Sequence, residues 1–357
     1  MRTLALAAIA LLSALPASAQ SAFPDDATLL ATIKNGVEDG RAAGIVLGVM
    51  DKDGSTRVVA YGDSGPGAKP LSADSIFEIG SVTKTFTATI LADMVMKDEV
   101  KLDVPAQTYA PEGLTLPKHD GKQITLANLS EQNSGLPRLP FNLAPKNITN
   151  PYADYTVEQL YAFLSSYKLT RDPGEQYEYS NLGVGLLGHL LAARAGESYE
   201  ALVTERVLAP LHMTSTGITL TPEMQANLAR GHNRKGDVVS NWDLPVLAGA
   251  GALRSSMTDM LKYLDANLGE PETELERAMR LAQQPRAKAS GKNEIGLNWI
   301  IIPTASGKIV AHDGGTGGYG AFIAFDPERE IGVVLLSNSA NVPADIAMRL
   351  LDPLKTP

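Results

Sequence analysis

The residue types with the clearest chemical potential are Ser81 and Lys84, in the stretch Gly-Ser-Val-Thr-Lys at residues 80–84. A serine hydroxyl becomes an effective nucleophile only when a neighbouring base takes its proton. A lysine amine can be that base when it is neutral, and burial lowers a lysine pKa by disfavouring the charged form. Because a spacing of three residues places both side chains on one helix face, the pair predicts covalent catalysis by an activated serine.

The position of this pair at a helix start strengthens the prediction. Apolar spacing predicts a helix over residues 82–97, so the Ser81 amide has no intrahelical partner and can donate to an oxyanion. The alternative is that Ser81 only caps the helix and Lys84 is solvated. A second S-x-x-K match, Ser165 and Lys168, lies late in another predicted helix, and we interpret it as helix surface.

A second motif, Tyr179-Ser180-Asn181, precedes a predicted helix over residues 181–195. A phenol paired with a lysine cation can lose its proton below its usual pKa of about 10 and relay a proton during catalysis. The Asn181 amide can hold both a substrate carbonyl and the lysine. The alternative is a half-buried tyrosine beside a helix cap.

A third motif, His312-Asp313-Gly314-Gly315, follows a predicted strand that ends near Ala311. Glycines beside an edge strand let a substrate backbone approach closely, and an extended substrate can lie along such an edge. The alternative is a glycine-rich hairpin without a ligand.

Together, and in this order, the three motifs resemble those of the penicillin-recognising serine hydrolases, specifically the class C β-lactamase group. That group includes D-alanyl-D-alanine carboxypeptidases and the related family VIII esterases. The likeness runs from about residue 44 to residue 351 and is far more specific for the family than for the substrate. It implies an α/β (α+β) chain with the β-lactamase/transpeptidase-like fold.

The resemblance also implies a role for each motif residue. Ser81 would be the acylated nucleophile, Lys84 its base partner, Tyr179 the proton relay, Asn181 a substrate-amide contact and His312 the third-motif residue, with the amides of Ser81 and Gly315 as the oxyanion hole. Substrate contacts would also come from Asp313 and Gly314. No cofactor or metal is implied, and whether Lys84 or Tyr179 is the general base stays open.

The third motif departs from the lysine-threonine-glycine sequence usual in class C β-lactamases, because His312 and Asp313 replace its first two residues. Asp313 would repel a substrate carboxylate, and Arg138 is a candidate replacement for the missing carboxylate anchor. The sequence therefore predicts a small-molecule substrate that is a β-lactam, a D-alanyl peptide or, as the alternative, a small ester. A further alternative is a penicillin-binding sensor without turnover.

The order of predicted elements places strands and a helix at both ends of the chain, with helices between them. This order predicts one antiparallel sheet flanked by the N- and C-terminal helices, with a mostly helical inserted region. We place the sheet region at residues 20–75 and 290–357 and the helical region at 76–289, together forming one catalytic domain.

Residues 1–19 have the features of a cleaved signal peptide: a basic start, a short apolar run and a small-residue end at Ala17-Ser18-Ala19. This pattern predicts a periplasmic or secreted protein. The remaining sequence contains no apolar run long enough to span a membrane. The 357-residue chain has no cysteine and a net charge of -9, which argues against thiol chemistry and against nucleic acid as a partner. The oligomeric state is left open.

Overall fold

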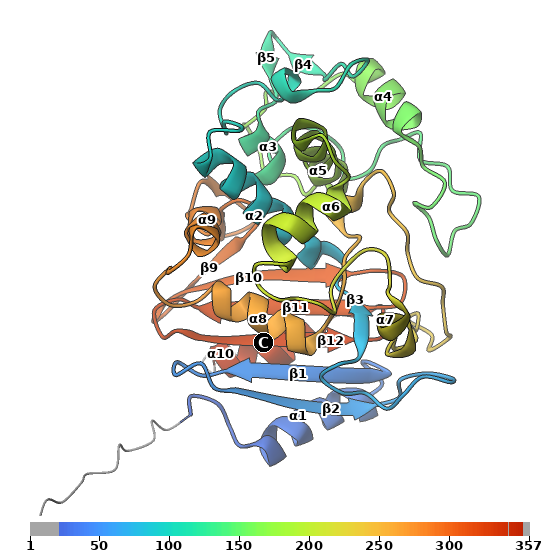
Figure 1. The fold of residues 1–357 in the computed structure, drawn as a ribbon, viewed down its shortest axis with the longest axis vertical. Helices are drawn as coiled ribbons and strands as arrows, with labels where there is room; N and C mark the ends of the chain where they lie inside the picture. Colours follow the sequence, from blue (N-terminus) through green and yellow to red (C-terminus); the bar gives the residue numbers. More distant parts are fainter. Residues whose placement is uncertain (1–20, 342, 353–357) are drawn as a thin grey trace, which may run out of the picture.

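The computed structural model describes residues 21–341 and 343–352, and its centre is one eight-stranded antiparallel sheet (Figure 1). The strands are β1 (Gly44–Met50), β2 (Thr56–Gly62), β7 (Ala287–Lys288), β8 (Glu294–Ile295), β9 (Ile300–Thr304), β10 (Gly307–Gly315), β11 (Gly320–Asp326) and β12 (Ile331–Ser337). Their order across the sheet is β2-β1-β12-β11-β10-β9-β8-β7. The sheet is therefore built from both ends of the chain, as the sequence predicts.

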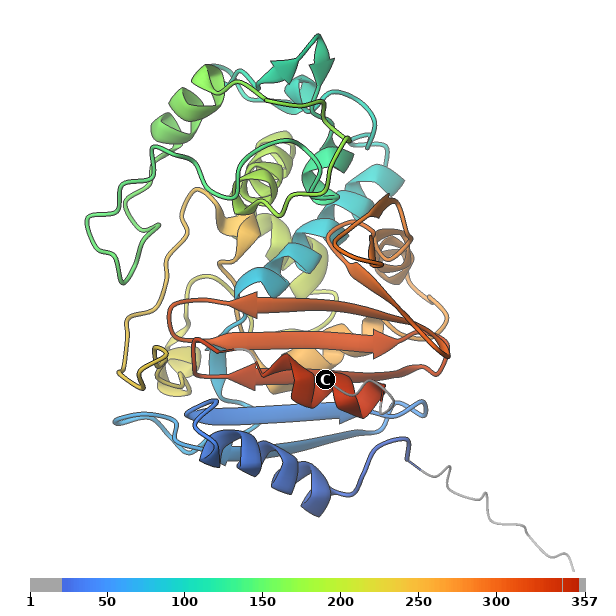
Figure 2. The same ribbon diagram turned by 180° about the vertical axis from the view of Figure 1, so that it is seen from behind.

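Two terminal helices, α1 (Asp26–Glu38) and α10 (Ala344–Leu351), lie side by side over one face of this sheet (Figure 2). Side chains alternate between the two faces of a strand. Accordingly, Ile45 and Leu47 of β1 pack towards these helices, while Val46 packs into the core on the opposite face. The central strands are buried on both faces, which explains their continuous apolar sequences.

The opposite face of the sheet carries α8 (Met257–Ala266), and the helical region lies beyond one edge of the sheet (Figure 1). The other helices are α2 (Thr83–Met96), α3 (Leu126–Ser130), α4 (Val157–Ser166), α5 (Asn181–Ala195), α6 (Tyr199–Val203), α7 (Pro222–Ala226) and α9 (Glu274–Ala282). Two short ribbons pair β3 (Ile76–Glu78) with β6 (Arg254–Ser256), and β4 (Lys118–His119) with β5 (Lys122–Gln123). Helices α2 and α5 are buried along most of their length.

Local signals set several of these boundaries. Helix α4 begins with a capping box, in which the Thr156 and Gln159 side chains each bond to the other residue's backbone amide. Helix α5 ends at Gly196, which adopts the left-handed conformation with φ of 77°. Helix α6 is followed by a π-helical turn over residues 204–208.

The strand predicted to end near Ala311 is longer than expected. Strand β10 continues to Gly315 because β11 pairs with it up to the Gly315–Gly320 register pair. The third motif therefore lies within a strand rather than after one. On its other side, β9 pairs with β10 only as far as Ala311, so the motif occupies a free strand edge among the described residues.

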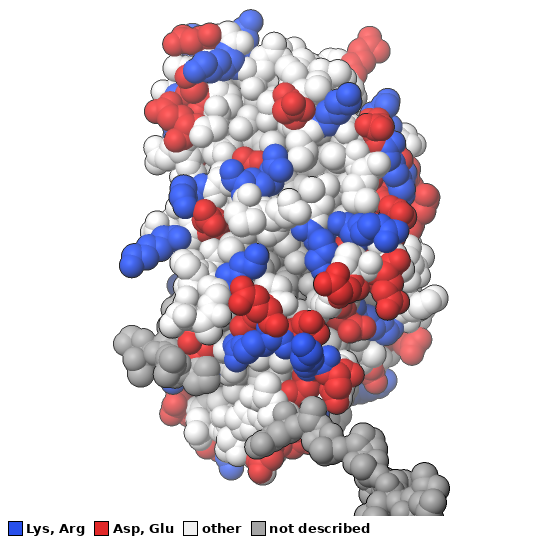
Figure 3. Space-filling model, turned by 90° about the vertical axis from the view of Figure 1, so that its left-hand side faces the viewer, with Lys and Arg blue, Asp and Glu red and all other residues white. Residues whose placement is uncertain are grey.

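The predicted fold class is confirmed by this arrangement. The division into a sheet region and a helical region stays a prediction, since α8 and β7 come from the middle segment and yet contact the sheet. The signal peptide predicted at residues 1–19 lies outside the described residues. Among the helices that the structure describes, none has the length and apolarity needed to cross a membrane. Figure 3 shows acidic and basic side chains interspersed over one face of the molecule.

Candidate active site

Ser81 lies in a single 3-10 turn, Gly80–Val82, that leads directly into α2. The prediction that Ser81 stands at a helix start is confirmed. Gly80 has φ of +47°, and a Cβ there would lie 2.8 Å from the amide nitrogen of Gly315. A side chain at residue 80 would thus push β10 away from the nucleophile.

Gly314 makes the matching contact from the strand. A Cβ at this position would lie 2.0 Å from the carbonyl oxygen of Ile79 and 2.9 Å from the amide nitrogen of Ser81. The sequence predicts that this glycine makes room for substrate, whereas the buried Gly314 makes room for the protein's own turn. Gly315, the next residue, is exposed and lines the cleft described below.

The Lys84 side chain is fully buried, and its amine has three neighbours. Its Nζ lies 2.9 Å from Ser81 Oγ, 2.9 Å from Asn181 Oδ1 and 2.6 Å from the carbonyl oxygen of Ala250. These neighbours come from three separate segments: the turn before α2, the first residue of α5, and the short 3-10 helix Ala248–Ala250. The helical region therefore fixes the amine beside the serine.

The surroundings of this amine favour its neutral form. Burial lowers the pKa of Lys84 well below its usual value, and the nearby positive charge of Arg138 lowers it further. The carboxylate of Asp313 opposes this shift but ranks behind both causes. The prediction that burial makes the lysine a usable base is consistent with these shifts.

The Tyr179 ring lies between two basic side chains, 5.0 Å from Lys84 Nζ and 4.9 Å from the guanidinium carbon of Arg138. The expectation that a lysine cation lowers the pKa of this phenol is wrong for this structure. Burial raises the Tyr179 pKa, and the opposing hydrogen bond with Ser81 does not offset it. Tyr179 is therefore a neutral phenol that can donate a proton.

His312 is buried and does not carry a charge at neutral pH. Burial lowers its pKa to about 4, and its Nδ1 lies 2.6 Å from the carbonyl oxygen of Asp313. The neighbouring Asp313 side chain is exposed and faces the cleft. The third motif thus supplies a neutral imidazole and one carboxylate, without a cation.

A cleft of about 600 Å³ gathers most of the predicted residues. Its lining residues are Ser81, Arg138, Leu139, Tyr152, Tyr179, Asn181, Arg234, Trp242, Asp313, Gly315, Ala340 and Asn341. Five of the eight predicted site residues are in this lining. The other three, Lys84, His312 and Gly314, are buried and lie outside the lining, where Lys84 and Gly314 contact or approach the Ser81 turn.

Several lining residues were not identified from the sequence. Trp242 and Tyr152 pack edge to face, with ring centroids 5.4 Å apart, and form an aromatic wall. Arg234 lies in a turn that no motif marks. The Ala250 carbonyl, which accepts a hydrogen bond from the Lys84 amine, was also not identified from the sequence. The only hint in the sequence was the run of alanines and glycines at residues 248–252, which permits close backbone approach.

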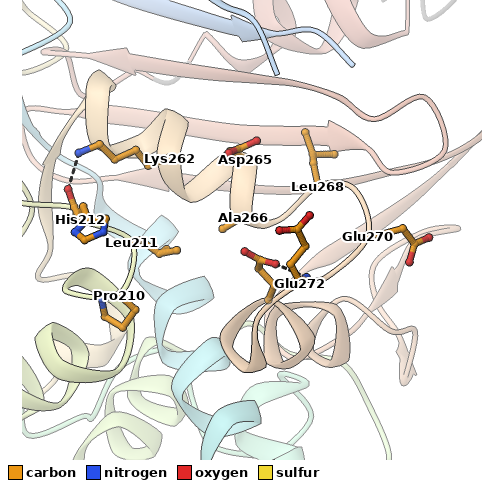
Figure 4. Close-up of a pocket in the computed structure, with 10 residues that line it drawn as sticks. Pro210, Leu211, His212, Lys262, Asp265, Ala266, Leu268, Glu270 and Glu272 are labelled. Carbon is orange, nitrogen blue, oxygen red and sulfur yellow. Dashed lines mark hydrogen bonds between the residues drawn. The ribbon is translucent and has the colours of Figure 1, made fainter. Parts of the chain in front are cut away.

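A second cavity, of about 540 Å³, lies between α8 and α9 (Figure 4). It is lined by Pro210, Leu211, His212, Lys262, Asp265, Ala266, Leu268, Glu270, Glu272 and Glu276. None of the three motifs contributes to it. Within residues 21–341 and 343–352, no group of three histidine, aspartate or glutamate side chains is arranged to hold a metal ion.

Comparison with known proteins agrees with this geometry. The sequence profile of the family described as Beta-lactamase matches residues 29–352. The chain belongs to the beta-lactamase family. The family predicted from the motifs is therefore confirmed, and the chain is a serine hydrolase of this family.

Family members with similar sequences include the D-alanyl-D-alanine-carboxypeptidase/endopeptidase AmpH of Escherichia coli K12, which is 32% identical over 83% of this chain and 79% of its own length. A β-lactamase of the same organism is 29% identical over 80% of this chain and 82% of its own length. The crystal structure of a β-lactamase/D-alanine carboxypeptidase from Pseudomonas syringae shares the fold, with a TM-score of 0.80, 22% identity, and coverage of 93% of this chain and 99% of that chain.

Proposed function

We propose that this family member transfers the acyl group of a D-alanyl peptide to Ser81 and then to water, and that β-lactams acylate the same serine. The observation that carries the proposal is the position of the Lys84 amine against the Ser81 hydroxyl. The resemblance of AmpH, a carboxypeptidase by name, supports the substrate class.

The hydrogen-bond partners of Lys84 favour it as the general base. A neutral amine has two N–H groups and one lone pair. Two of its neighbours, the Ala250 carbonyl and Asn181 Oδ1, can only accept hydrogen bonds, so they take the two N–H groups. The lone pair is then left for the third neighbour, the hydroxyl of Ser81, 2.9 Å away.

The reaction follows from these positions. Ser81 Oγ attacks the substrate carbonyl as its proton passes to Lys84, and the amides of Ser81 and Gly315 stabilise the oxyanion. The neutral phenol of Tyr179 donates its proton to the leaving nitrogen as the carbon–nitrogen bond breaks. The Lys84 ammonium returns a proton to Tyr179. Water then hydrolyses the serine ester, and Ser81 regains its proton.

The third motif is a poor anchor for a substrate carboxylate, and this holds for a D-alanyl peptide as well as for a cephalosporin, because both carry one. Because His312 is neutral, the third motif offers no cation to a substrate carboxylate, and the exposed Asp313 repels one. Arg138 and Arg234 line other walls of the cleft, and neither forms an ion pair with any described residue. We propose that they take over the attraction of anionic groups on the substrate.

A carboxylesterase is the second candidate, and the Asp313 side chain in the cleft favours it. A neutral ester needs no carboxylate anchor, so Asp313 would not oppose its binding. The same Ser81, Lys84 and Tyr179 would perform the acyl transfer.

Parallel turnover measurements test the proposal. Purified protein is assayed with a D-Ala-D-Ala peptide, a chromogenic cephalosporin and a short-chain nitrophenyl ester, and penicillin adducts are detected by intact mass. We expect peptide turnover and a penicillin adduct that Ser81→Ala removes. A preference for the ester of about a hundredfold, or about 2.7 kcal/mol, would establish the esterase instead. A stable adduct without turnover of any substrate would identify a sensor.

We also propose that the protein is exported and that cleavage after Ala19 leaves Gln20 as the first residue. Export would bring the enzyme to the compartment that contains peptidoglycan peptides. The intact mass of protein recovered from the periplasm tests this proposal, since it should equal the mass of residues 20–357. Recovery of the uncleaved chain from the cytoplasm would contradict it.

A further inference from the structure

Glu78 is a buried carboxylate that the proposed reaction does not use. It ends β3, three residues before Ser81, and its exposed fraction is 3%. Its Oε1 accepts a hydrogen bond of 2.7 Å from the backbone N–H of Trp242, while its Oε2 is buried without a hydrogen bond to any described residue. Burying a carboxylate that has one oxygen without a hydrogen bond is unfavourable. We therefore expect Glu78 to have a role at this place that offsets the cost.

The carboxylate connects segments that meet at the cleft. Burial raises the pKa of Glu78, while the side chains of Thr316 and Asn241 and the charge of Arg254 oppose that shift, so all three lie near it. Thr316 directly follows Gly315, the proposed oxyanion donor. Asn241 directly precedes Trp242, which forms the cleft wall.

Arg254 binds the carbonyl group of the same tryptophan whose backbone N–H is bound by Glu78. It is the register partner of Glu78 in the β3–β6 ribbon, with 3.6 Å between the closest charged atoms. Its guanidinium donates to the carbonyl oxygen of Trp242 at 2.8 Å, and to the Asp243 carboxylate at 3.0 Å. Both peptide groups of Trp242 are therefore fixed by this one pair of side chains.

The indole of Trp242 in turn lies against the glycine-rich loop after β10. A Cβ at Gly317 would lie 2.6 Å from the indole Nε1, so loop and ring are in close contact. This contact is two residues beyond Gly315. A displaced Trp242 would release the loop that directly follows Gly315, the proposed oxyanion donor.

We propose that Glu78 is a positioning residue of the active site, which together with Arg254 fixes Trp242 as the cleft wall and holds Gly315 in place relative to Ser81. This inference rests on the proposed acyl transfer at Ser81. Glu78 itself contacts no reacting atom in the proposed mechanism. A misplacement of about 1 Å can lower a rate by about a hundredfold, which makes such a residue matter for catalysis.

The test compares Glu78→Ala and Glu78→Gln with a matched buried carboxylate outside the cleft. Asp259 is suitable because its exposed fraction is 1% and it accepts a 2.7 Å hydrogen bond from the backbone N–H of Ser215. We expect Glu78→Ala to lower kcat by about 10- to 100-fold. Glu78→Gln keeps an oxygen for the Trp242 N–H and should restore kcat to within about threefold. Asp259→Ala should lower Tm but not kcat.

Two outcomes would overturn the inference. One is an unchanged kcat in Glu78→Ala. The other is a loss of kcat in Asp259→Ala as large as that in Glu78→Ala. If Glu78→Ala does not fold, Thr316→Val removes one neighbouring hydroxyl while keeping the side-chain shape, and we expect a several-fold loss of kcat with an unchanged Tm. A wild-type kcat in Thr316→Val would then count against the inference.

Fluorescence separates this inference from the proposed function. The chain has two tryptophans, and Trp299 is fully buried, so acrylamide quenching reports on Trp242. We expect Glu78→Ala to increase quenching of Trp242, whatever substrate the enzyme takes. Unchanged quenching would refute the positioning of Trp242, whereas failure of the proposed function would show as a wild-type protein without adduct or turnover.

Discussion

The chain contains the S-x-x-K pattern twice, and the two copies differ in everything except residue type and spacing. Ser81 and Lys84 begin a buried helix, and the Lys84 amine is bonded to segments from elsewhere in the chain. Ser165 is in the last turn of α4, Lys168 lies beyond the end of that helix, and both are exposed. The comparison teaches that the pattern acquires its chemistry from burial and from distant partners.

The largest effect should come from removing the two serines in turn. Ser81→Ala should lower kcat/KM by about 10⁴-fold or more, because the acyl-enzyme cannot form. Ser165→Ala removes only an exposed hydroxyl and should leave kcat/KM unchanged. Steady-state kinetics with the preferred substrate measure both. Residual activity above a tenth of wild type in Ser81→Ala would remove the distinction between the two copies.

Replacing the two lysines should have the next largest effect. Lys84→Gln should lower kcat/KM by about 10³-fold through loss of the general base, while Lys168→Gln serves as the unaffected control. In the wild type, kcat/KM should rise with pH as Lys84 loses its proton, because only the neutral amine accepts the serine proton. The lowered pKa of Lys84 places this rise well below pH 10.5. A pH profile that rises only near pH 10.5 would contradict the role of burial.

Replacing the tyrosines Tyr179 and Tyr161 in turn should give a smaller loss of kcat than replacing the lysines. Tyr179→Phe keeps the ring between Lys84 and Arg138 but removes the proton donor, and kcat should fall by about 10²-fold. Tyr161 provides the control, since its hydroxyl bonds to His189, a residue outside the cleft lining. Tyr161→Phe should therefore keep wild-type kcat. Equal losses in the two variants would indicate a general structural effect.

The smallest effect concerns stability and the buried His312. Its pKa of about 4 lies below its ordinary value of 6.5, so the unfolded chain binds more protons between these values. Stability therefore falls as pH decreases from 6.5 towards 4, by about 2 kcal/mol at pH ~4.5. His312→Gln should remove this acid-induced loss of stability. Denaturant unfolding at pH 6.5 and at pH ~4.5 measures the free energy of unfolding of both proteins.

His119 is the matched contrast because its hydrogen bond with Asp172 raises its pKa. The stabilisation from that bond is present at low pH and is lost as pH increases through the raised pKa. His119→Gln should therefore leave the acid-induced loss of stability in place. An acid response of His312→Gln equal to that of the wild type would show that His312 is not buried in neutral form.

Much of the fold was predictable because its signals are local. Apolar alternation, the capping box at Thr156 and the terminating Gly196 each act within a few residues. The length of β10 was not predictable, since its extension depends on pairing with β11. The π-helical turn after α6 likewise has no signal in the sequence pattern.

In the candidate site, too, local sequence signals were predictable, whereas features set by the whole fold were not. Motif spacing identified residues that the structure brings together around the Ser81 hydroxyl, and it placed Ser81 correctly at a helix start. The raised pKa of Tyr179 escaped sequence reasoning because burial, a property of the whole fold, sets it. The Ala250 carbonyl and the Trp242 wall escaped because neither belongs to a motif.

The backbone contact between Gly80 and Gly315 joins the first quarter of the chain to its final strands. Ser81 and Lys84 emerge early from the ribosome, but Gly315, the second oxyanion donor in the proposed mechanism, is made late. In the proposed mechanism, acyl transfer can therefore begin only after β10 has been made and has docked against the Ser81 turn. Together with the proposed export, this order would delay activity until the chain has folded at its destination.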